Sequence, residues 1–152
     1  MSGVIGTNLL AQVGFVVRDI EETKRKFAEF FGVDVPENIP CDKYEVSKAE
    51  YKGEPMKEAD CKMAFFSVGE GIKIELIEPN DKPSTWRDFL DNHGEGVHHL
   101  AFRVKGMKEV LRSCESFGMP LEQKGENATG RYAYVNASAD LKVILELLEN
   151  DK

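Results

Sequence analysis

Two adjacent histidines stand at the start of a β-patterned run, GEGVHHLAFRV at residues 94–104. Imidazole is a common metal ligand and general base, so His98 and His99 are the first candidates for chemistry. A similar run, QVGFVV, occurs near the N-terminus at residues 12–17. When the two runs are superposed, His99 falls on Gln12 and Phe102 on Phe15. This repeat indicates one module used twice, with a site where the two copies face each other.

Four β-patterned runs each carry one side chain that can bind a metal ion. These side chains are Gln12, Glu75, His99 and Glu146. Side chains alternate along a strand, so the apolar neighbours of each one should face the opposite side of the sheet. One imidazole, one amide oxygen and two carboxylates suit Zn, Ni, Co, Mn or Fe, and two carboxylates balance a divalent charge. The same-face neighbours Gly14 and Ala101 are small, which predicts room for a ligand.

Each copy of the module is expected to consist of a strand, a helix and three further strands. In the first copy, strand 12–17 precedes a helix that begins after Asp19 and ends at Gly32, and strands follow at 62–68 and 72–77. In the second copy, strand 99–104 precedes a helix over 105–117, and strands follow at 120–124, 131–136 and 142–148. A short helix, capped by Ser84, should connect the copies.

This order of elements predicts an α+β fold rather than an alternating α/β fold. We expect a single domain over residues 1–152, with module one at about 8–80 and module two at about 94–150. The two βαβββ modules should be related by pseudo-twofold symmetry. Each sheet should curve around the metal site, with the helices on its outer face.

Some local features carry predictions of their own. Residues 34–60 are charged and irregular and lengthen the first module, and the part around 44–51 is expected to pair as a strand. Phe27, Phe30 and Phe31 should form the buried stripe of the first helix, and Lys24 to Lys26 its solvated face. Phe117 should face inward from the second helix. His98 should point away from His99 and act in packing or in support of the site.

The composition is that of a soluble globular protein, with 41% hydrophobic and 31% charged residues. A net charge of −7 and a pI of about 5.1 argue against binding to nucleic acid or to an anionic membrane. Three widely spaced cysteines favour a reducing compartment over a disulfide framework. No signal peptide or membrane-spanning run is visible, so a cytoplasmic location is predicted.

The stretches GEGVHHLAFRV, IKIELIEP and VILELLE resemble the vicinal oxygen chelate superfamily, which includes glyoxalase I, methylmalonyl-CoA epimerase, bleomycin-resistance proteins and extradiol dioxygenases. The resemblance extends from residue 12 to residue 149 and is closest to the epimerases. Carried over, it implies the metal ligands Gln12, Glu75, His99 and Glu146. The epimerases usually have histidine at the first of these positions. Glutamine there resembles some glyoxalase I enzymes, so the resemblance leaves the substrate open.

The resemblance implies one divalent metal ion, Zn, Ni, Co or Mn, that binds two oxygens of a small substrate and stabilises an enediolate. Glu75 and Glu146 would be catalytic, one removing a proton and the other returning it. Return to the same carbon would make an epimerase, and return to the neighbouring carbon a glyoxalase I-like lyase (lactoylglutathione lyase). Arg131 and Tyr132, at the head of a strand bordering the site, are candidate substrate-binding residues.

Three functions therefore stay open at this point. The first is an epimerase or isomerase that acts on a small acid or an acyl-CoA, and the second is a lyase that acts on a hemithioacetal. The third is a metal-free resistance protein that binds a small molecule, although that branch generally lacks the full ligand set. A dioxygenase is disfavoured because Gln12 replaces one of the histidines of a two-histidine-one-carboxylate iron site. Relatives are commonly dimers, and each module needs a partner surface to close its sheet, so a homodimer is expected.

Overall fold

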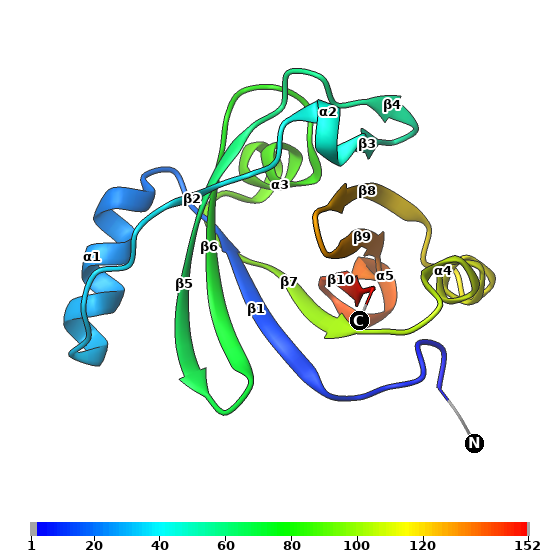
Figure 1. Ribbon diagram of the computed structural model, residues 1–152, viewed down its shortest axis with the longest axis horizontal. Helices are drawn as coiled ribbons and strands as arrows, with labels where there is room; N and C mark the ends of the chain where they lie inside the picture. The colour runs from blue at the N-terminus through cyan, green and yellow to red at the C-terminus, as the bar shows by residue number, and fades with distance from the viewer. Residues whose placement is uncertain (1–2, 152) are drawn as a thin grey trace.

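The computed structural model describes residues 3–151 and contains one ten-stranded sheet that is rolled into a half-barrel (Figure 1). The strands are β1 (Leu10–Val16), β2 (Ile39–Pro40), β3 (Glu50–Tyr51), β4 (Glu54–Pro55), β5 (Cys61–Gly69), β6 (Ile72–Pro79), β7 (Gly96–Arg103), β8 (Leu121–Asn127), β9 (Gly130–Asn136) and β10 (Ile144–Asn150). The helices are α1 (Ile20–Phe31), α2 (Tyr44–Ser47), α3 (Thr85–His93), α4 (Met107–Ser116) and α5 (Ser138–Leu141). The predicted α+β fold is confirmed.

The sheet has the internal symmetry that the sequence repeat predicts. Its order is β2-β5-β6-β1-β7-β10-β9-β8-β3-β4, so the run outward from β1 matches the run outward from β7. β1 and β7 pair antiparallel at the centre, with Gln12 opposite Ala101 and Gly14 opposite His99. A twofold axis that exchanges Gln12 with His99 and Gly14 with Ala101 requires this pairing. The two modules pair with each other within one chain, through β1 and β7 at the centre of the sheet.

The helices α1 and α4 cover the outer face of the curved sheet (Figure 1). Asp19 caps α1 by accepting a hydrogen bond from the backbone N–H of Glu22 at 3.1 Å, and Gly32 ends it with φ of 71°. Phe27 on α1 packs edge-on against Phe15 of β1, with ring centroids 5.7 Å apart. The apolar side of each first strand is therefore buried against the helix that follows it.

The buried side of α1 differs from the prediction. Its fully buried residues are Ile20, Lys24 and Ala28, whereas Phe30 is 84% exposed. Lys24 was expected in solvent, but its Nζ lies 2.8 Å from Asn38 Oδ1 and 3.3 Å from Glu21 Oε1. The segment after the helix thus supplies a polar partner to the buried lysine, which periodicity within the helix could not show. Phe117, expected to face inward at the end of α4, is 54% exposed.

The long segment of module one crosses over to module two. Of the strand expected around 44–51, the end at Glu50–Tyr51 forms the short strand β3, while Tyr44–Ser47 forms the short helix α2, and the two-residue strand β4 follows. β3 pairs antiparallel with β8, with Glu50 opposite Lys124 and Tyr51 opposite Gln123. In Figure 1 this segment lies across the open side of the curve, beyond α3. It therefore ties the two halves together over the concave face.

None of the helices in the described part of the chain is long and apolar enough to cross a membrane.

Candidate metal centre

Four neighbouring central strands present one polar side chain each to the concave face. The side chains are those of Gln12 on β1, Glu75 on β6, His99 on β7 and Glu146 on β10. In the sheet register, Glu75 and His99 flank Gly14, while Gln12 and Glu146 flank Ala101. The twofold symmetry therefore places the two glutamates in equivalent positions on either side of the central strand pair.

The ligand atoms of these residues converge. His99 Nε2 lies 3.2 Å from Glu75 Oε1 and 3.1 Å from Glu146 Oε1, and one donor atom from each of the three residues lies within 4.8 Å of the others. Two ligand atoms bound at about 2.1 Å and at right angles to each other would lie about 3.0 Å apart. The spacing therefore fits three ligands around a single ion, and Glu75, His99 and Glu146 could hold a divalent metal.

The atoms that would bind an ion have no hydrogen-bond partner in the protein. Four buried side-chain atoms in the described chain lack one, and they are Gln12 Oε1, Glu75 Oε1, His99 Nε2 and Glu146 Oε1. A proton on His99 Nε2 would pair that atom with the two carboxylates beside it, but Gln12 Oε1 would still lack a partner in the described chain, and burying such an atom costs about 1–3 kcal/mol. A metal ion would satisfy all four atoms, so these residues fit one.

Gly14 makes space for the imidazole of His99. A Cβ atom at residue 14 would lie 1.9 Å from His99 Cε1 and 2.3 Å from His99 Nε2. The small residue was expected to leave room for a ligand, but the ring of His99 fills that room. Glycine is therefore needed at residue 14 for the ring to reach the two glutamates.

His98 supports His99 directly. The two Nδ1 atoms lie 2.9 Å apart, and His98 Nε2 lies 3.1 Å from Thr85 Oγ1. The two rings were expected on opposite faces, but a β-bulge intervenes. Gly14 pairs with His99 and Phe15 pairs with Val97, so His98 is the extra residue and its side chain turns to the same side.

This contact fixes which nitrogen of His99 is free. If Nε2 of His99 binds a metal ion, its Nδ1 must carry the proton and donate to His98 Nδ1. His98 Nε2 then carries a proton and donates to Thr85 Oγ1. A second residue that holds the ligand ring in one tautomer is the usual support for a metal-binding histidine.

Burial and charge shift the pKa values of these groups in opposite directions. Burial lowers the pKa of His99, but the carboxylates of Glu146 and Glu75 outweigh it and raise this pKa to about 9. Burial raises the pKa of Glu75, with the charge of Glu146 adding to the effect. Burial and the neighbouring His99 hold the pKa of His98 well below its usual value, so His98 stays neutral.

A cavity of about 330 Å³ opens onto the centre. Gln12, Glu75 and Glu146 lie in its wall with Trp86, Tyr132 and Tyr134, and apolar side chains such as Met63, Phe65 and Leu148 form another part. The long segment of module one supplies Cys41, Asp42, Ser47, Ala49, Met56 and Ala59. The cavity is large enough for a small organic substrate beside a bound ion.

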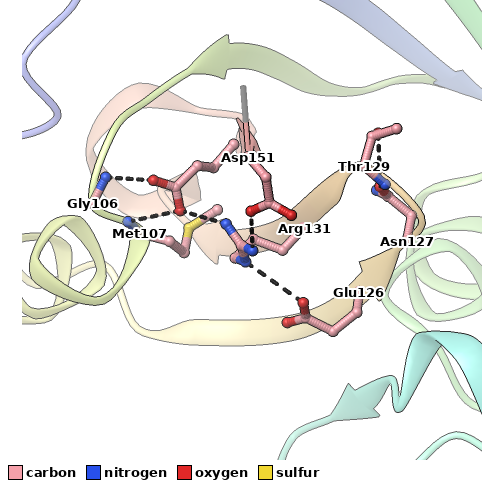
Figure 2. Close-up of polar contacts among 8 residues, drawn as sticks. Gly106, Met107, Glu126, Asn127, Thr129, Arg131 and Asp151 are labelled. Carbon is pink, nitrogen blue, oxygen red and sulfur yellow. Dashed lines mark hydrogen bonds and ion pairs between the residues drawn. The ribbon is translucent and has the colours of Figure 1, made fainter.

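The two predicted substrate-binding residues lie in different places. Tyr132 lies in the cavity wall, and its hydroxyl accepts a hydrogen bond from Gln123 Nε2 at 3.2 Å. Arg131 is not among the cavity-lining residues of the described chain. Figure 2 shows it between Glu126 and Asp151, close to the backbone of Gly106 and Met107 at the start of α4. The geometry of Arg131 is that of a surface ion-pair cluster.

Sequence reasoning missed Gln123 and Tyr134. Gln123 is fully buried, although its neighbours Glu122 and Lys124 are polar. Trp86 donates from Nε1 to the hydroxyl of Tyr134 at 3.0 Å, and the Tyr134 ring packs against His99 with centroids 5.2 Å apart. The sequence leaves Trp86 either at the site entrance, beside the helix cap Ser84, or in simple packing, and the structure has it in the cavity wall. The bulge on β8 and the pairing of β3 with β8 determine the position of Gln123, and local sequence patterns show neither.

The chain was compared with known proteins. The family model for the glyoxalase/bleomycin resistance protein/dioxygenase superfamily matches residues 11–135. The uncharacterized protein YqjC of Bacillus subtilis (strain 168) is 31% identical over 99 residues, covering 63% of this chain and 70% of that protein.

Solved structures with the same fold include methylmalonyl-CoA epimerase from Mycobacterium tuberculosis, at 22% identity and a TM-score of 0.65 over 94% of this chain and 88% of that one. Hypothetical protein BH1468 from Bacillus halodurans C-125 is also 22% identical, with a TM-score of 0.67 over 96% of both chains. A variant of Streptomyces coelicolor methylmalonyl-CoA epimerase in complex with 2-nitronate-propionyl-CoA is 18% identical, with a TM-score of 0.64 over 94% of this chain and 97% of that one. The family match covers most of the sequence and both modules, and the chain belongs to the glyoxalase/bleomycin resistance protein/dioxygenase superfamily.

Proposed function

We propose that this chain is a divalent-metal-dependent enzyme that moves a proton on a carbon next to a carbonyl group. The observation that carries the proposal is the convergence of Glu75, His99 and Glu146, with the buried and unpartnered Oε1 of Gln12 in the wall of the same cavity. These residues would hold one Zn, Ni, Co or Mn ion. The ion would supply Lewis acidity, which lowers the pKa of a C–H bond beside a carbonyl.

Glu75 and Glu146 would carry the proton. They occupy symmetry-equivalent positions on β6 and β10, so they face the space between them from two sides. Their side chains are only 7% and 8% exposed, which keeps bulk water from competing for the proton.

The first candidate reaction is an epimerisation like that of methylmalonyl-CoA epimerase. Several solved structures with this fold are named as that enzyme, and one of them holds 2-nitronate-propionyl-CoA. One carboxylate would take the proton from one side of the acyl carbon, and the other would return a proton to the opposite side. The cavity of about 330 Å³ would hold the acyl group, with the rest of an acyl-CoA outside it.

The alternative is a glyoxalase I-like lyase that acts on a hemithioacetal. The glutamine at residue 12 supports it, because a Gln/Glu/His/Glu set resembles some members of that branch. Proton return to the neighbouring carbon would then replace return to the same carbon. The site weighs against a metal-free resistance protein, since Gln12 Oε1 would stay without a partner there even with His99 protonated between the two carboxylates.

The test begins with metal content. Purified protein is dialysed and reloaded with Ni, Co, Mn and Zn in turn, and bound metal is measured for the parent chain, Glu75→Gln, Glu146→Gln and Glu149→Gln. We expect about one ion per parent chain and at least about 100-fold weaker binding in the first two variants. Glu149→Gln is the matched control, because it removes a carboxylate from the same strand as Glu146 but outside the site, and it should bind like the parent.

Activity is then assayed on the loaded protein. Solvent-deuterium exchange into methylmalonyl-CoA would identify the epimerase, and turnover of the glutathione hemithioacetal of methylglyoxal would identify the lyase. Full activity in both Glu75→Gln and Glu146→Gln would exclude their role in proton transfer. No metal binding by a folded parent chain would overturn the proposal.

A homodimer in the cytoplasm is part of the same proposal. The site is complete within one chain, so dimerisation is not needed to bring the four side chains together. Sedimentation at micromolar concentration measures the assembly, and a monomeric profile would contradict the dimer.

A further inference from the structure

We propose that Gln123 holds the hydroxyl of Tyr132 as a hydrogen-bond donor directed into the cavity, so that the site selects ligands with an acceptor oxygen there. The reading of that ligand as a substrate rests on the proposed function. The orientation of Gln123 and Tyr132 is independent of the proposed function, because neither residue belongs to the candidate metal centre.

A bulge on β8 places Gln123 inside the protein. β8 pairs with β9 so that Leu121 lies opposite Val135 and Gln123 opposite Tyr134, which leaves Glu122 as an extra residue. This shift turns the side chain of Gln123 inward, where it is fully buried. A buried amide needs partners for both its oxygen and its nitrogen.

The start of α3 determines which end of the amide faces Tyr132. Thr85 is the first residue of α3, and its backbone N–H donates to Gln123 Oε1 at 2.9 Å. A helix leaves its first N–H groups without partners in the helix, and a backbone N–H can only donate. The opposite orientation of the amide would bring two donors together. Gln123 Nε2 must therefore face the Tyr132 hydroxyl, at 3.2 Å.

The hydroxyl of Tyr132 consequently accepts from the protein and keeps its own proton free. Within residues 3–151, no acceptor for that proton is found in the protein. Gly125, opposite Tyr132 across β8 and β9, allows the ring to lie against the strand, because a Cβ there would lie 2.7 Å from Tyr132 Cε1 and 3.0 Å from its hydroxyl oxygen. Burial raises the pKa of Tyr132, so the hydroxyl stays protonated at neutral pH.

The ligand class follows from this polarity. A carbonyl or carboxylate oxygen of a ligand in the cavity would accept the Tyr132 proton. A ligand that presents only a donor at that point would leave two donors facing each other. Gln123 acts through Tyr132 and is a positioning residue, and Tyr132 is the residue that would touch the ligand.

The orientation of the amide is measurable without metal or substrate. In metal-free protein labelled with ¹⁵N and ¹³C, we expect a coupling across the hydrogen bond between the Thr85 amide nitrogen and the Gln123 side-chain carbonyl carbon, together with slow exchange of the Thr85 amide proton. Fast exchange and no coupling would show that the amide does not hold this orientation, and would overturn the proposal.

The effect on a ligand is measured with oxalate, which chelates a metal through two oxygens and leaves two further oxygens as acceptors. Calorimetric titration of the Ni-loaded protein should give about tenfold weaker oxalate binding for Tyr132→Phe, which lacks the donor. Gln123→Glu should weaken binding equally, because its carboxylate would accept both from Thr85 and from the Tyr132 hydroxyl. Gln123→Met should lose less affinity than Gln123→Glu, because it removes the hydrogen bond that positions the hydroxyl but leaves the Tyr132 proton free.

The double variant separates polarity from packing. If Gln123→Glu acts only through the tyrosine proton, adding it to Tyr132→Phe has no further effect on oxalate affinity. Equal losses in Gln123→Met and Gln123→Glu would indicate a purely structural role and contradict the proposal. A parent chain that binds no nickel would overturn the proposed function, and the coupling in the metal-free protein would still decide the orientation of Gln123.

Discussion

Carboxylates gather in two regions of this protein, and their surroundings are opposite. At the candidate metal centre, Glu75 and Glu146 are buried, and an oxygen of each lies close to His99 Nε2, at 3.2 Å and 3.1 Å. At the start of α4, Arg131 lies against Glu126, Glu149 and Asp151, all on the surface (Figure 2). Glu149 also accepts from the backbone N–H groups of Gly106, at 2.6 Å, and Met107, at 3.2 Å.

The difference distinguishes a candidate ligand-binding site from an ion-pair cluster that stabilises the fold. In the surface cluster, charge and hydrogen bonds are satisfied within the protein, and the result links β9 and β10 to the start of α4. In the buried centre, two carboxylates share one imidazole nitrogen and Gln12 Oε1 has no partner in the described chain, at a cost in stability that a bound ligand would recover. An acidic cluster alone therefore says little about function, whereas buried and unpaired ligand atoms say much.

Among variants that leave the candidate ligands unchanged, Gly14→Ala should have the largest effect on metal binding. The new Cβ would overlap the ring of His99, so the ring must move away from both glutamates. We expect metal binding to fall at least about 100-fold, and the free energy of unfolding of the metal-free protein to fall by about 1–3 kcal/mol.

The control for Gly14→Ala is Ala101→Gly at the symmetry-equivalent residue. It adds no atom, so metal binding should persist, with a loss of about 1 kcal/mol in unfolding free energy. Metal titration and urea unfolding measure both variants. Parent-like metal affinity in Gly14→Ala would show that the position of the His99 ring does not matter.

A second variant removes the hydrogen bond that orients His99 and leaves the candidate ligands themselves unchanged. His98→Leu removes the partner of His99 Nδ1, and we expect metal affinity to fall about 10–100-fold. His98→Asn places an oxygen that can accept from His99 Nδ1, so it should recover most of the affinity. The Co(II) absorption spectrum reports the coordination geometry. Equal losses in the two variants would mean that His98 contributes only packing.

The pH dependence should also differ between the two regions. His99 has a pKa near 9 in the metal-free fold and an ordinary value of 6.5, so its charged pairing stabilises the fold fully below about pH 6.5 and is lost as pH rises through about 9. Metal binding needs the unprotonated ring, so affinity should rise about tenfold per pH unit from 7 to 9, with release of about one proton at pH 7. Calorimetry in buffers of different ionisation enthalpy counts that proton. A pH-independent affinity would contradict the charged state of His99.

The smallest effect is expected at the surface cluster. The backbone N–H groups of Gly106 and Met107, with Arg131, lower the pKa of Glu149, so its contribution is present above its ordinary value of 4.5 and is lost as pH falls below it. Glu149→Gln should lower the melting temperature slightly at pH 7 and make no difference at low pH, with metal content unchanged. A loss of bound metal in Glu149→Gln would contradict the assignment of the surface cluster to stability alone.

Much of the fold follows from the repeat in the sequence. The superposition of Gln12 on His99 already places four polar side chains at equivalent points, and the structure brings those four together. Capping residues give the bounds of α1 to within one residue, because Asp19 and Gly32 have side-chain and backbone roles that depend only on local structure.

Other features depend on contacts between distant segments, and local patterns cannot show them. Lys24 is buried because Asn38 reaches back to it, and His98 faces His99 because a bulge adds one residue to β7. Gln123 is buried because β8 bulges and β3 pairs alongside it. In each case the tertiary arrangement reverses what the period of the strand or helix predicts.

The long segment of module one, which ends in the pairing of β3 with β8, has a consequence for stereochemistry. Two glutamates related by a twofold axis would treat the two faces of a planar carbon identically. This segment supplies cavity wall from one module only, so it breaks that equivalence. A planar prochiral carbon held in the cavity would therefore contact a different surface on each of its faces. The cavity of this duplicated fold can thus favour one stereochemical outcome over the other.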